Sequence, residues 1–580
     1  MRSDQQQAIN RLAGTSATAF LCAVLCVYPL YIDKFSNLGV TKFTGCFTLF
    51  LLFLLWLVAC TAIGARAPRP RNANAGRDVT LWGVLAFAGT SLISTFTSLS
   101  PTASTWGLGG YYGGLMLVLF TAAGYWAVRS YLDLENLDFV FWVLGITTSI
   151  VAVLYVLNIF NIDLIGAYAD TAVVERAQFF STLGQKDFNG CFFSVALPIV
   201  FYQFLNAKDT RTAVGTGIPA AFGALALAVV DSEALALGIG AAVMVLVCHK
   251  NFTTRHLRRA ALISAAFFGW AAWMHYMRAS VYTQGGTALL AKLGAWQVAL
   301  PCMAASLLLW LVLFVLARKG IAAQAPLYLP GRVITIAVLA VGALAFVLAN
   351  AMPNLPLPES LHNLLVFNDD WGTYRGVAWR AAFGTWADGS LLRKIVGIGP
   401  GMMHTAVAAW AGDAMTARMA TFYAAHNEYL EQLLTTGILG LAAWLLLVAA
   451  HLRRGERSWN TPGVAPVMLA LCSYLAQAVV SIRVSMVFPL VMLLFGALGV
   501  VLRKFRIPLG PFILGFLIGP SAERALRQAL SMGNNDVMVL FQRPIAIAFY
   551  VATIAFICII AYTFRKNKET LDKGAHSDDE

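Results

Sequence analysis

Charge is what this sequence has least of. Only 12% of its 580 residues are Asp, Glu, Lys or Arg, whereas 59% are hydrophobic. Soluble domains carry about twice that charged share, so the composition excludes an ordinary water-soluble protein. The mean hydropathy of +0.71 agrees with this conclusion. The sequence therefore predicts an integral membrane protein.

The sequence also lacks the motifs of several enzyme classes. Its nine cysteines include no CxxC pair and no His/Cys cluster at zinc-ligand spacing, so no metal site is predicted. It has no P-loop, no dinucleotide-binding glycine fingerprint and no GxSxG motif, and we expect no cofactor. The longest loop holds only about 75 residues, fewer than a compact catalytic domain usually needs.

Long apolar runs fill most of the chain. About 20 apolar residues in a helix cross roughly 30 Å of hydrocarbon, and about fourteen to sixteen such runs occur. They show no alternation of apolar and polar residues, so helices rather than a β-barrel must satisfy the backbone in lipid. An all-α polytopic transmembrane bundle is predicted. The runs lie at 16–33, 43–64, 79–98, 108–128, 139–158, 190–206, 214–230, 234–248, 260–277, 294–317, 333–351, 430–450, 465–482, 485–502 and 542–563.

Membrane topology explains the net charge of +13 better than binding to nucleic acid does. Basic residues concentrate in alternate loops, as they do on the cytoplasmic side of membrane proteins. The N-terminus belongs to the same side, which places the large loop at 351–429 on the outer face. The basic segments are 65–77, 249–259, 317–320 with Arg332, 453–457 and 503–506.

Two outer segments carry polar residues that suit an anion. The run at 190–206 is preceded by Gly184, Gln185, Lys186, Asp187 and Asn189. A helix that starts near Asn189 would point its N–H groups and the positive end of its dipole at a ligand. Ordinary helix capping is the alternative interpretation.

The second segment is "WGTYRGVAWRAAFGTW" in the large loop, and its apolar residues recur at helical spacing. This pattern predicts an amphipathic helix on or near the membrane surface. Arg375 and Trp379 share one face, and Arg380 begins the next. A guanidinium suits a diphosphate, and a tryptophan suits a sugar face or a lipid headgroup; a simple interfacial anchor is the alternative. The apolar positions are Tyr374, Val377, Ala378, Ala381, Ala382 and Trp386.

Two short stretches follow. "GIGPG" at 397–401 predicts a tight turn whose bare backbone allows a ligand to come close, or simply a turn. "HNEYLE" at 426–431 stands at the outer end of a predicted span. A neutral imidazole there can take a proton from a hydroxyl near neutral pH, although polar residues at such a boundary also serve as solvated caps.

Together these stretches resemble the O-antigen ligase and O-antigen polymerase superfamily over roughly residues 15–500. "HNEYLEQLLTTGILGL" is similar to that family's His-Asn and Gly-x-x-Gly signature. "YRGVAWRAAF" with "VGIGPG" resembles its Arg-x-x-x-Trp and glycine loop. "GQKDFNGCFFSVALP" and "SPTASTWGLGGYYGGLMLVL" resemble two earlier motifs, in the family's order.

The resemblance implies transfer of a glycan from a polyprenyl diphosphate to a glycan, lipid or protein acceptor. The reaction would take place on the outer face of the bacterial cytoplasmic membrane, among membrane lipids. His426 would deprotonate the acceptor and Arg375 would hold the diphosphate. The expected donor-binding residues are Lys186, Arg176, Asp187, Trp379, Arg380, Gly399 and Gly401, and the expected supporting residues are Asn427, Glu428 and Tyr429.

This chain departs from the family at two positions. Glu233 in "DSEALALG" stands where the family has an arginine, and Asp187 stands where it often has asparagine. Lys186 or Arg176 is the expected replacement for the missing positive charge.

Near residue 488 the sequence begins to resemble a different protein family. From there on, about 70 residues resemble the end of the large permease subunit of tripartite tricarboxylate transporters. This resemblance divides the chain into a ligase-like part at 1–487 and a permease-like segment at 488–580 with a cytoplasmic or unassigned tail. Two other functions stay open. One is a transporter of small organic anions using Asp187, Glu233 and His426. The other is a scaffold that packs through "GGYYGGLM".

Overall fold

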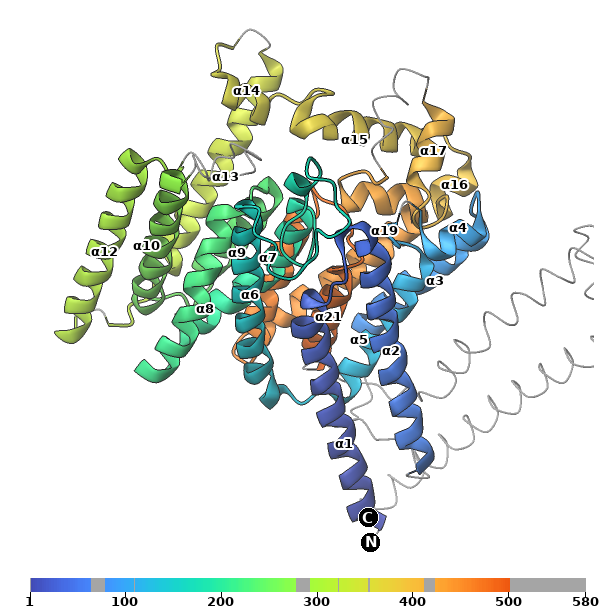
Figure 1. The fold of residues 1–580 in the computed structure, drawn as a ribbon, viewed down its shortest axis with the longest axis horizontal. Coiled ribbons are helices and arrows are strands. Elements are labelled where there is room, and N and C mark those ends of the chain that lie inside the picture. The colour runs from blue at the N-terminus through green and yellow to red at the C-terminus, as the bar shows by residue number, and fades with distance from the viewer. Residues whose placement is uncertain are drawn as a thin grey trace, which may run out of the picture. The chain divides into compact units, whose positions relative to one another are not determined.

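The computed structural model describes residues 2–63, 79–108, 110–277, 293–321, 323–352, 355–411 and 423–500. Over these ranges the chain is helical, with two isolated β-bridges as the sole strand-like pairings. Figure 1 shows long helices side by side and shorter ones, α14 to α17, at one end of the bundle.

The α-helices are α1 (Arg2–Cys22), α2 (Leu38–Ile63), α3 (Val79–Phe96), α4 (Pro101–Trp106), α5 (Leu115–Tyr131), α6 (Leu137–Ile159), α7 (Lys186–Asn206), α8 (Thr210–Val229), α9 (Glu233–Cys248), α10 (Thr254–Met277), α12 (Trp296–Arg318), α13 (Tyr328–Ala351), α14 (Glu359–Leu365), α15 (Trp371–Ala387), α16 (Leu391–Val396), α17 (Met403–Trp410), α19 (Glu428–Arg457), α20 (Val464–Gln477) and α21 (Phe488–Val500). Short π or 3-10 turns are η1 (Ala23–Val27), η2 (Tyr28–Leu30), η3 (Phe35–Asn37), η4 (Leu134–Asn136) and η5 (Arg176–Gln178).

The predicted helical membrane bundle is confirmed. Among the described residues, eight helices are long and apolar enough to cross a membrane. Every predicted run from 16–33 to 485–502 contains a helix, so the chain is a multi-pass membrane protein. Full-length spans are fewer than predicted, in part because four apolar helices are short; α9, with 16 residues, is only about 24 Å long. The run at 542–563 lies outside the described residues.

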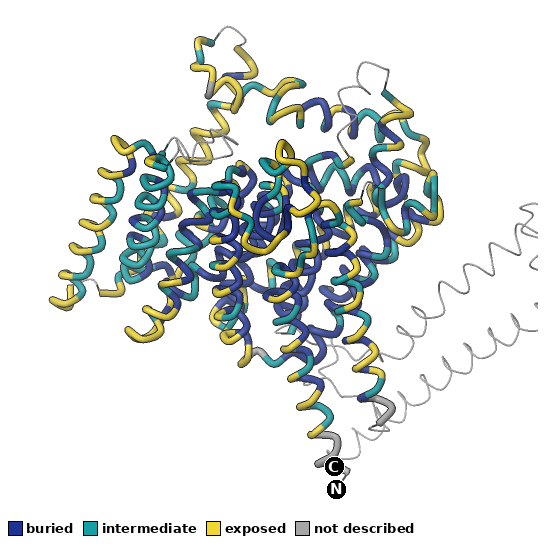
Figure 2. Tube along the Cα trace, viewed as in Figure 1, coloured by how far each residue is buried: buried dark blue, intermediate teal, exposed yellow. Residues whose placement is uncertain are grey.

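Burial distinguishes central helices from peripheral ones. In α7, 83% of the apolar window is buried within the protein, whereas in α12 and α13 the share is 6%. Figure 2 shows the same contrast, with the centre dark blue and α12 largely exposed. The exposed leucines and valines of α12 and α13 suit lipid, since apolar side chains lose nothing by facing hydrocarbon.

The glycine-rich stretch at 107–114 is not a packing helix. The predicted run at 108–128 becomes helical only at Leu115, and the described residues before it form a loop. Tyr112 and Gly110 have positive φ angles of 50° and 74°, which a helix does not accommodate. The proposed small-residue packing face at 109–115 is therefore wrong.

Helix α19 is interrupted at Gly437, where φ is 69° and ψ is −173°. The glycine loop after α16 lies against this interruption. Ile398 N donates to the carbonyl oxygen of Leu434 (3.3 Å), and Gly399 N donates to that of Thr435 (2.9 Å). Ser94 Oγ of α3 also donates to Thr435 O (2.5 Å). Three donors from elsewhere in the chain thus satisfy carbonyls that the interruption leaves without helical partners.

Three of the basic segments meet at one end of the bundle, which we call the basic face. The rings of His249 and Trp459 stack with their centroids 4.0 Å apart. Leu327 N donates to Phe252 O (2.9 Å), and Arg332 Nε donates to Cys248 O (3.0 Å). The loops after α9, α12 and α19 therefore share a face, as the loop charges predicted. The segments 65–77 and 503–506 lie outside the described residues.

The change of sequence character at 488 does not coincide with a structural boundary. The chain divides into two compact units, Met1–Arg506 and Ile507–Glu580. Residues 488–499 of α21 are fully buried among the other helices of the first unit. Helix α21 is apolar and therefore packs in the bundle, although its sequence resembles that of a permease subunit. Residues 501–580 lie outside the described ranges.

Candidate functional site

The candidate site lies at the ends of α7, α9, α15 and α19 that are opposite the basic face. Helix α9 shows this arrangement: Glu233 begins it at the site, and Cys248 ends it beside Arg332. We call this end of the bundle the site face. The described parts of the large loop form α14 to α17 on it (Figure 1).

Asn427 fixes the start of α19. Its Oδ1 accepts hydrogen bonds from the backbone N–H groups of Tyr429 (3.0 Å) and Leu430 (3.1 Å), as a helix N-cap does. The preceding residue, His426, has a positive φ of 49°. This left-handed conformation is costly for a residue other than glycine. The cap therefore holds the imidazole in a defined place just outside the helix.

Helix α15 supplies Arg375 and Trp379 to the same place. Trp379 Nε1 donates to the backbone carbonyl of His426 (3.3 Å). Burial, and then the positive charge of Arg375, lower the pKa of His426 to about 4, while the carboxylate of Asp187 opposes this shift. The imidazole is consequently neutral at neutral pH and can accept a proton.

That α15 lies on or near the membrane surface stays a prediction, whereas the contacts of its apolar face are defined by the structure. Its apolar face is buried against other parts of the protein, because small side chains allow close packing. Tyr374 does not belong to that face: it is exposed and has a φ of 69°, as the first residues of α15 are left-handed. The buried cluster comprises Val377, Ala378, Ala381, Ala382, Ile398, Met402, Met403, Ala406, Val407, Ala425 and Leu434.

Arg375 is paired with Glu233. Its Nη1 lies 3.3 Å from Oε2 of Glu233, and their side chains are 13% and 74% exposed. The largely buried guanidinium is thus paired with a carboxylate that faces solvent. Sequence reasoning named both residues but did not predict that they contact each other.

Helix α7 begins at Lys186, three residues before the predicted start, so Lys186 and Asp187 lie in its first turn. Lys186 Nζ is 3.7 Å from Oδ2 of Asp231, and Ser232 Oγ donates to Oδ1 of Asp187 (3.0 Å). Burial raises the pKa of Asp231, which Lys186 counteracts. Asn189 is buried, and its Nδ2 donates to the backbone carbonyls of Phe180 (3.2 Å) and Gly184 (2.9 Å), so it holds the preceding loop against α7 and does not cap the helix.

The fixed charges of the site do not favour an anion outright. Lys186 and Arg375 contribute two positive charges, whereas Asp187, Asp231 and Glu233 contribute three negative ones. An anionic ligand must therefore replace at least one carboxylate partner. Among the described residues, no group of three or more His, Cys, Asp or Glu is placed to hold a metal ion.

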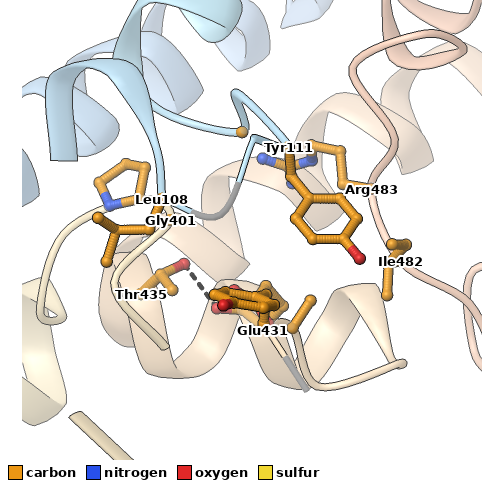
Figure 3. Close-up of a pocket in the computed structure, with 11 residues that line it drawn as sticks. Leu108, Tyr111, Gly401, Glu431, Thr435, Ile482 and Arg483 are labelled. Atoms are coloured by element: carbon orange, nitrogen blue, oxygen red, sulfur yellow. Dashed lines mark hydrogen bonds between the residues drawn. The ribbon is translucent and has the colours of Figure 1, made fainter. Parts of the chain in front are cut away.

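Three predicted donor-binding residues have other partners. The Arg176 guanidinium lies over the ring of Tyr168 at 5.4 Å, within its own loop. Arg380 Nη2 pairs with Oδ2 of Asp369 at 2.5 Å. Gly399 is packed against protein: a Cβ there would lie 2.3 Å from Ser98 Oγ. Gly401, in contrast, lines a pocket (Figure 3).

Glu428 and Tyr429 join α19 to the rest of the bundle. Glu428 is buried, accepts a hydrogen bond from Tyr474 Oη (2.6 Å) and pairs with Arg483 Nε at 3.0 Å. Tyr429 Oη donates to Leu475 O (2.9 Å). Arg483 is a residue that sequence reasoning missed. A lone arginine between the predicted runs at 465–482 and 485–502 was the available signal.

Comparison with known proteins adds no relative. No protein-family model matches this chain, and no curated protein matches it.

Proposed function

We propose that this protein transfers a glycan from a polyprenyl diphosphate to an acceptor hydroxyl, as an O-antigen ligase or a polysaccharide polymerase does. The observation that carries the proposal is a neutral imidazole, His426, held beside the guanidinium of Arg375 at one face of a membrane bundle. We place this face on the outer side of a bacterial cytoplasmic membrane, because the basic face is the expected cytoplasmic side.

The two residues divide the chemistry. His426 takes the proton of the acceptor hydroxyl while its oxygen attacks the anomeric carbon of the donor sugar. The bond from that carbon to the diphosphate oxygen breaks, and polyprenyl diphosphate leaves with the electron pair. Arg375 stabilises the charge that develops on this leaving group. The sequence motifs around both residues resemble those of the ligase superfamily.

Glu233 is a difference between this chain and the ligase superfamily, which has an arginine at the corresponding position. The donor diphosphate has to displace its carboxylate from Arg375, since the two side chains are already paired. The exposure of Glu233 supports such an exchange, because a solvated carboxylate leaves an ion pair at little cost.

The test is accumulation of lipid-linked glycan in cells that carry the wild-type chain, a deletion, His426→Ala or Arg375→Ala, with membrane levels of each variant checked. We expect the lipid-linked glycan to accumulate in all three defective strains. Purified His426→Ala should bind donor normally but transfer slowly, whereas Arg375→Ala should also bind donor more weakly. Long accumulated chains indicate a ligase and single repeat units a polymerase.

No accumulation in any of these strains would contradict the proposal. Uptake of small organic anions is then the next assay. The transporter alternative has one observation in its favour, which is that Lys42 and the Glu428–Arg483 pair are buried charges within the bundle. Each has a protein partner, however: Lys42 Nζ donates to the carbonyl oxygens of Tyr28 (3.2 Å) and Pro29 (2.9 Å).

A further inference from the structure

The turn between α7 and α8 lies on the basic face. Helix α7 begins at the site face and ends at Asn206, so this turn is at the opposite end of the bundle. Helix α10 begins beside it, because the guanidinium of Arg255 in its first turn donates to the carbonyl oxygen of Ala207. Residues 207–211 and 255–259 therefore form one surface, which we call the α7–α8 corner.

Two arginines of α10 hold the corner together. Arg259 Nη1 donates to the carbonyl oxygens of Phe204 (3.0 Å) and Leu205 (3.1 Å), and Arg255 binds that of Ala207. These carbonyls belong to the end of α7, where a helix has no N–H partners for them. Positive charge also suits this end of the helix dipole. Both arginines thus bind neutral carbonyl groups and neutralise no carboxylate.

The corner carries an excess of positive charge. Five lysines and arginines lie in its two segments against one carboxylate, Asp209. Asp209 caps α8, since its oxygens accept hydrogen bonds from the N–H (2.8 Å) and the hydroxyl (2.9 Å) of Thr212. In the part of the chain that the structure describes, no ion pair joins any of the five cations to a carboxylate. The cations are Lys208, Arg211, Arg255, Arg258 and Arg259.

An open apolar face of α8 begins next to this charge. Arg211, Val214 and Ile218 follow one another at intervals of three and four residues, so they share one face. Val214 and Ile218 are 60% and 58% exposed, and the start of α8 is among the exposed parts in Figure 2. Gly215 lies between them, and a Cβ there would have no neighbour within 4 Å. With a rise of about 1.5 Å per residue, Val214 is about 5 Å and Ile218 about 10 Å deeper in the membrane than Arg211.

We infer that the α7–α8 corner binds an anionic phospholipid of the leaflet that it faces. The phosphate lies among Lys208, Arg211 and Arg258, which are exposed or partly exposed, and one acyl chain lies along Val214 and Ile218. A soluble anion uses only the charges and not the apolar face, which is at the depth of the hydrocarbon. The expected cytoplasmic leaflet is the one whose anionic lipids attract basic segments of membrane proteins. The inference does not depend on the proposed transfer reaction.

The experiment titrates lipids onto the purified full-length protein in detergent and detects the bound molecules by native mass spectrometry. The probes are dioleoylphosphatidylglycerol, which is anionic, and dioleoylphosphatidylcholine, which has the same chains and a phosphate but no net charge. We expect the first molecule of phosphatidylglycerol to bind more tightly than the first molecule of phosphatidylcholine. Millimolar inorganic phosphate should not displace it, because phosphate makes no contact with the apolar face.

Variants test which cations are responsible. Arg211→Gln should weaken binding of the first phosphatidylglycerol by about fivefold, the loss expected for one basic residue near a membrane surface. The triple variant Lys208→Gln/Arg211→Gln/Arg258→Gln should bind the two lipids equally. The double variant Lys208→Gln/Arg211→Gln changes exposed residues alone and keeps the test valid if the triple variant does not fold. Arg453→Gln is the matched control, an exposed arginine of the basic face on α19, which packs mainly against α3; it should bind both lipids as the wild type does.

Three results would overturn the inference. The first is equal affinity of the wild type for the two lipids, or unchanged binding of phosphatidylglycerol in both multiple variants. The second is an equal loss in Arg453→Gln and Arg211→Gln, since the general charge of the basic face would then explain the binding. The third is displacement of phosphatidylglycerol by inorganic phosphate, which would make a soluble anion the occupant of the corner.

Discussion

His426 owes its chemical character to residues that are far from it in the sequence. Sequence reasoning selected it together with Arg375, Trp379 and Asp187, and these residues do influence one another in the structure. The pairing of Glu428 with Arg483 could not be predicted in the same way, since 55 residues separate them and Arg483 belongs to no motif recognised in the sequence. Contacts of this kind depend on how helices pack.

The pKa of His426 predicts the pH dependence of transfer. Because the imidazole is protonated only near pH 4, kcat/KM should stay constant from pH 8 to below 6 and fall as the pH approaches about 4. Asp187→Asn removes a charge that favours the protonated ring, so it should move this acidic limb to lower pH. A limb near the ordinary histidine value of about 6.5, or a shift upwards in Asp187→Asn, would contradict the assignment.

Glu233 should act as a competitor of the donor. Glu233→Gln removes the carboxylate from Arg375, so donor KM should fall by about two- to fivefold, with little change in kcat. Steady-state kinetics with varied donor measure the effect. Glu175→Gln, an exposed glutamate in the loop before α7, is the matched control. An increase in donor KM would mean that Glu233 itself binds the donor.

At the scale of elements, apolar runs predicted the helices because lipid leaves the backbone no alternative. The interruptions of the helices were not predicted, since each depends on contacts with residues that are distant in the sequence. The interruption of α19 needs the turn at 397–399, and a Cβ on Gly437 would lie 2.2 Å from Ile395 O. The left-handed start of α15 at Gly372 gives no periodic signal either.

Gly437→Ala should destabilise the protein. The substitution forces alanine to adopt a φ of 69° against the carbonyl of Ile395, at a cost of about 2–4 kcal/mol. Thermal unfolding in detergent should show a midpoint several degrees below that of the wild type. Gly342→Ala in α13 has no neighbour within 4 Å of the new Cβ and should not lower the midpoint. Equal midpoints for both variants would refute the strain argument.

At the scale of the whole molecule, polar residues are divided between two opposite faces. The basic face carries the loops after α9, α12 and α19, and the site face carries His426, Arg375 and the described parts of the large loop. Loop charges sufficed to predict this division. They did not predict which residues of the site face meet, because composition carries no information on packing.

Cysteine labelling tests the orientation of the two faces. Glu359→Cys on the site face should react with a membrane-impermeant maleimide in intact spheroplasts. Glu456→Cys, which lies beside His249 on the basic face, should react only after permeabilisation. The wild-type chain measures the background from its own cysteines. The reverse pattern of labelling would place the site on the cytoplasmic side.

The interruption of α19 has a consequence for how the protein is made. The carbonyls of Leu434 and Thr435 receive their hydrogen bonds from Ser94, Ile398 and Gly399. All three donors precede α19 in the chain, so the ribosome has synthesised them before this helix reaches the bilayer. When α19 enters the bilayer, the donors for these two carbonyls have therefore already been synthesised. The carbonyls can be hydrogen-bonded at once and are not left unpaired in lipid.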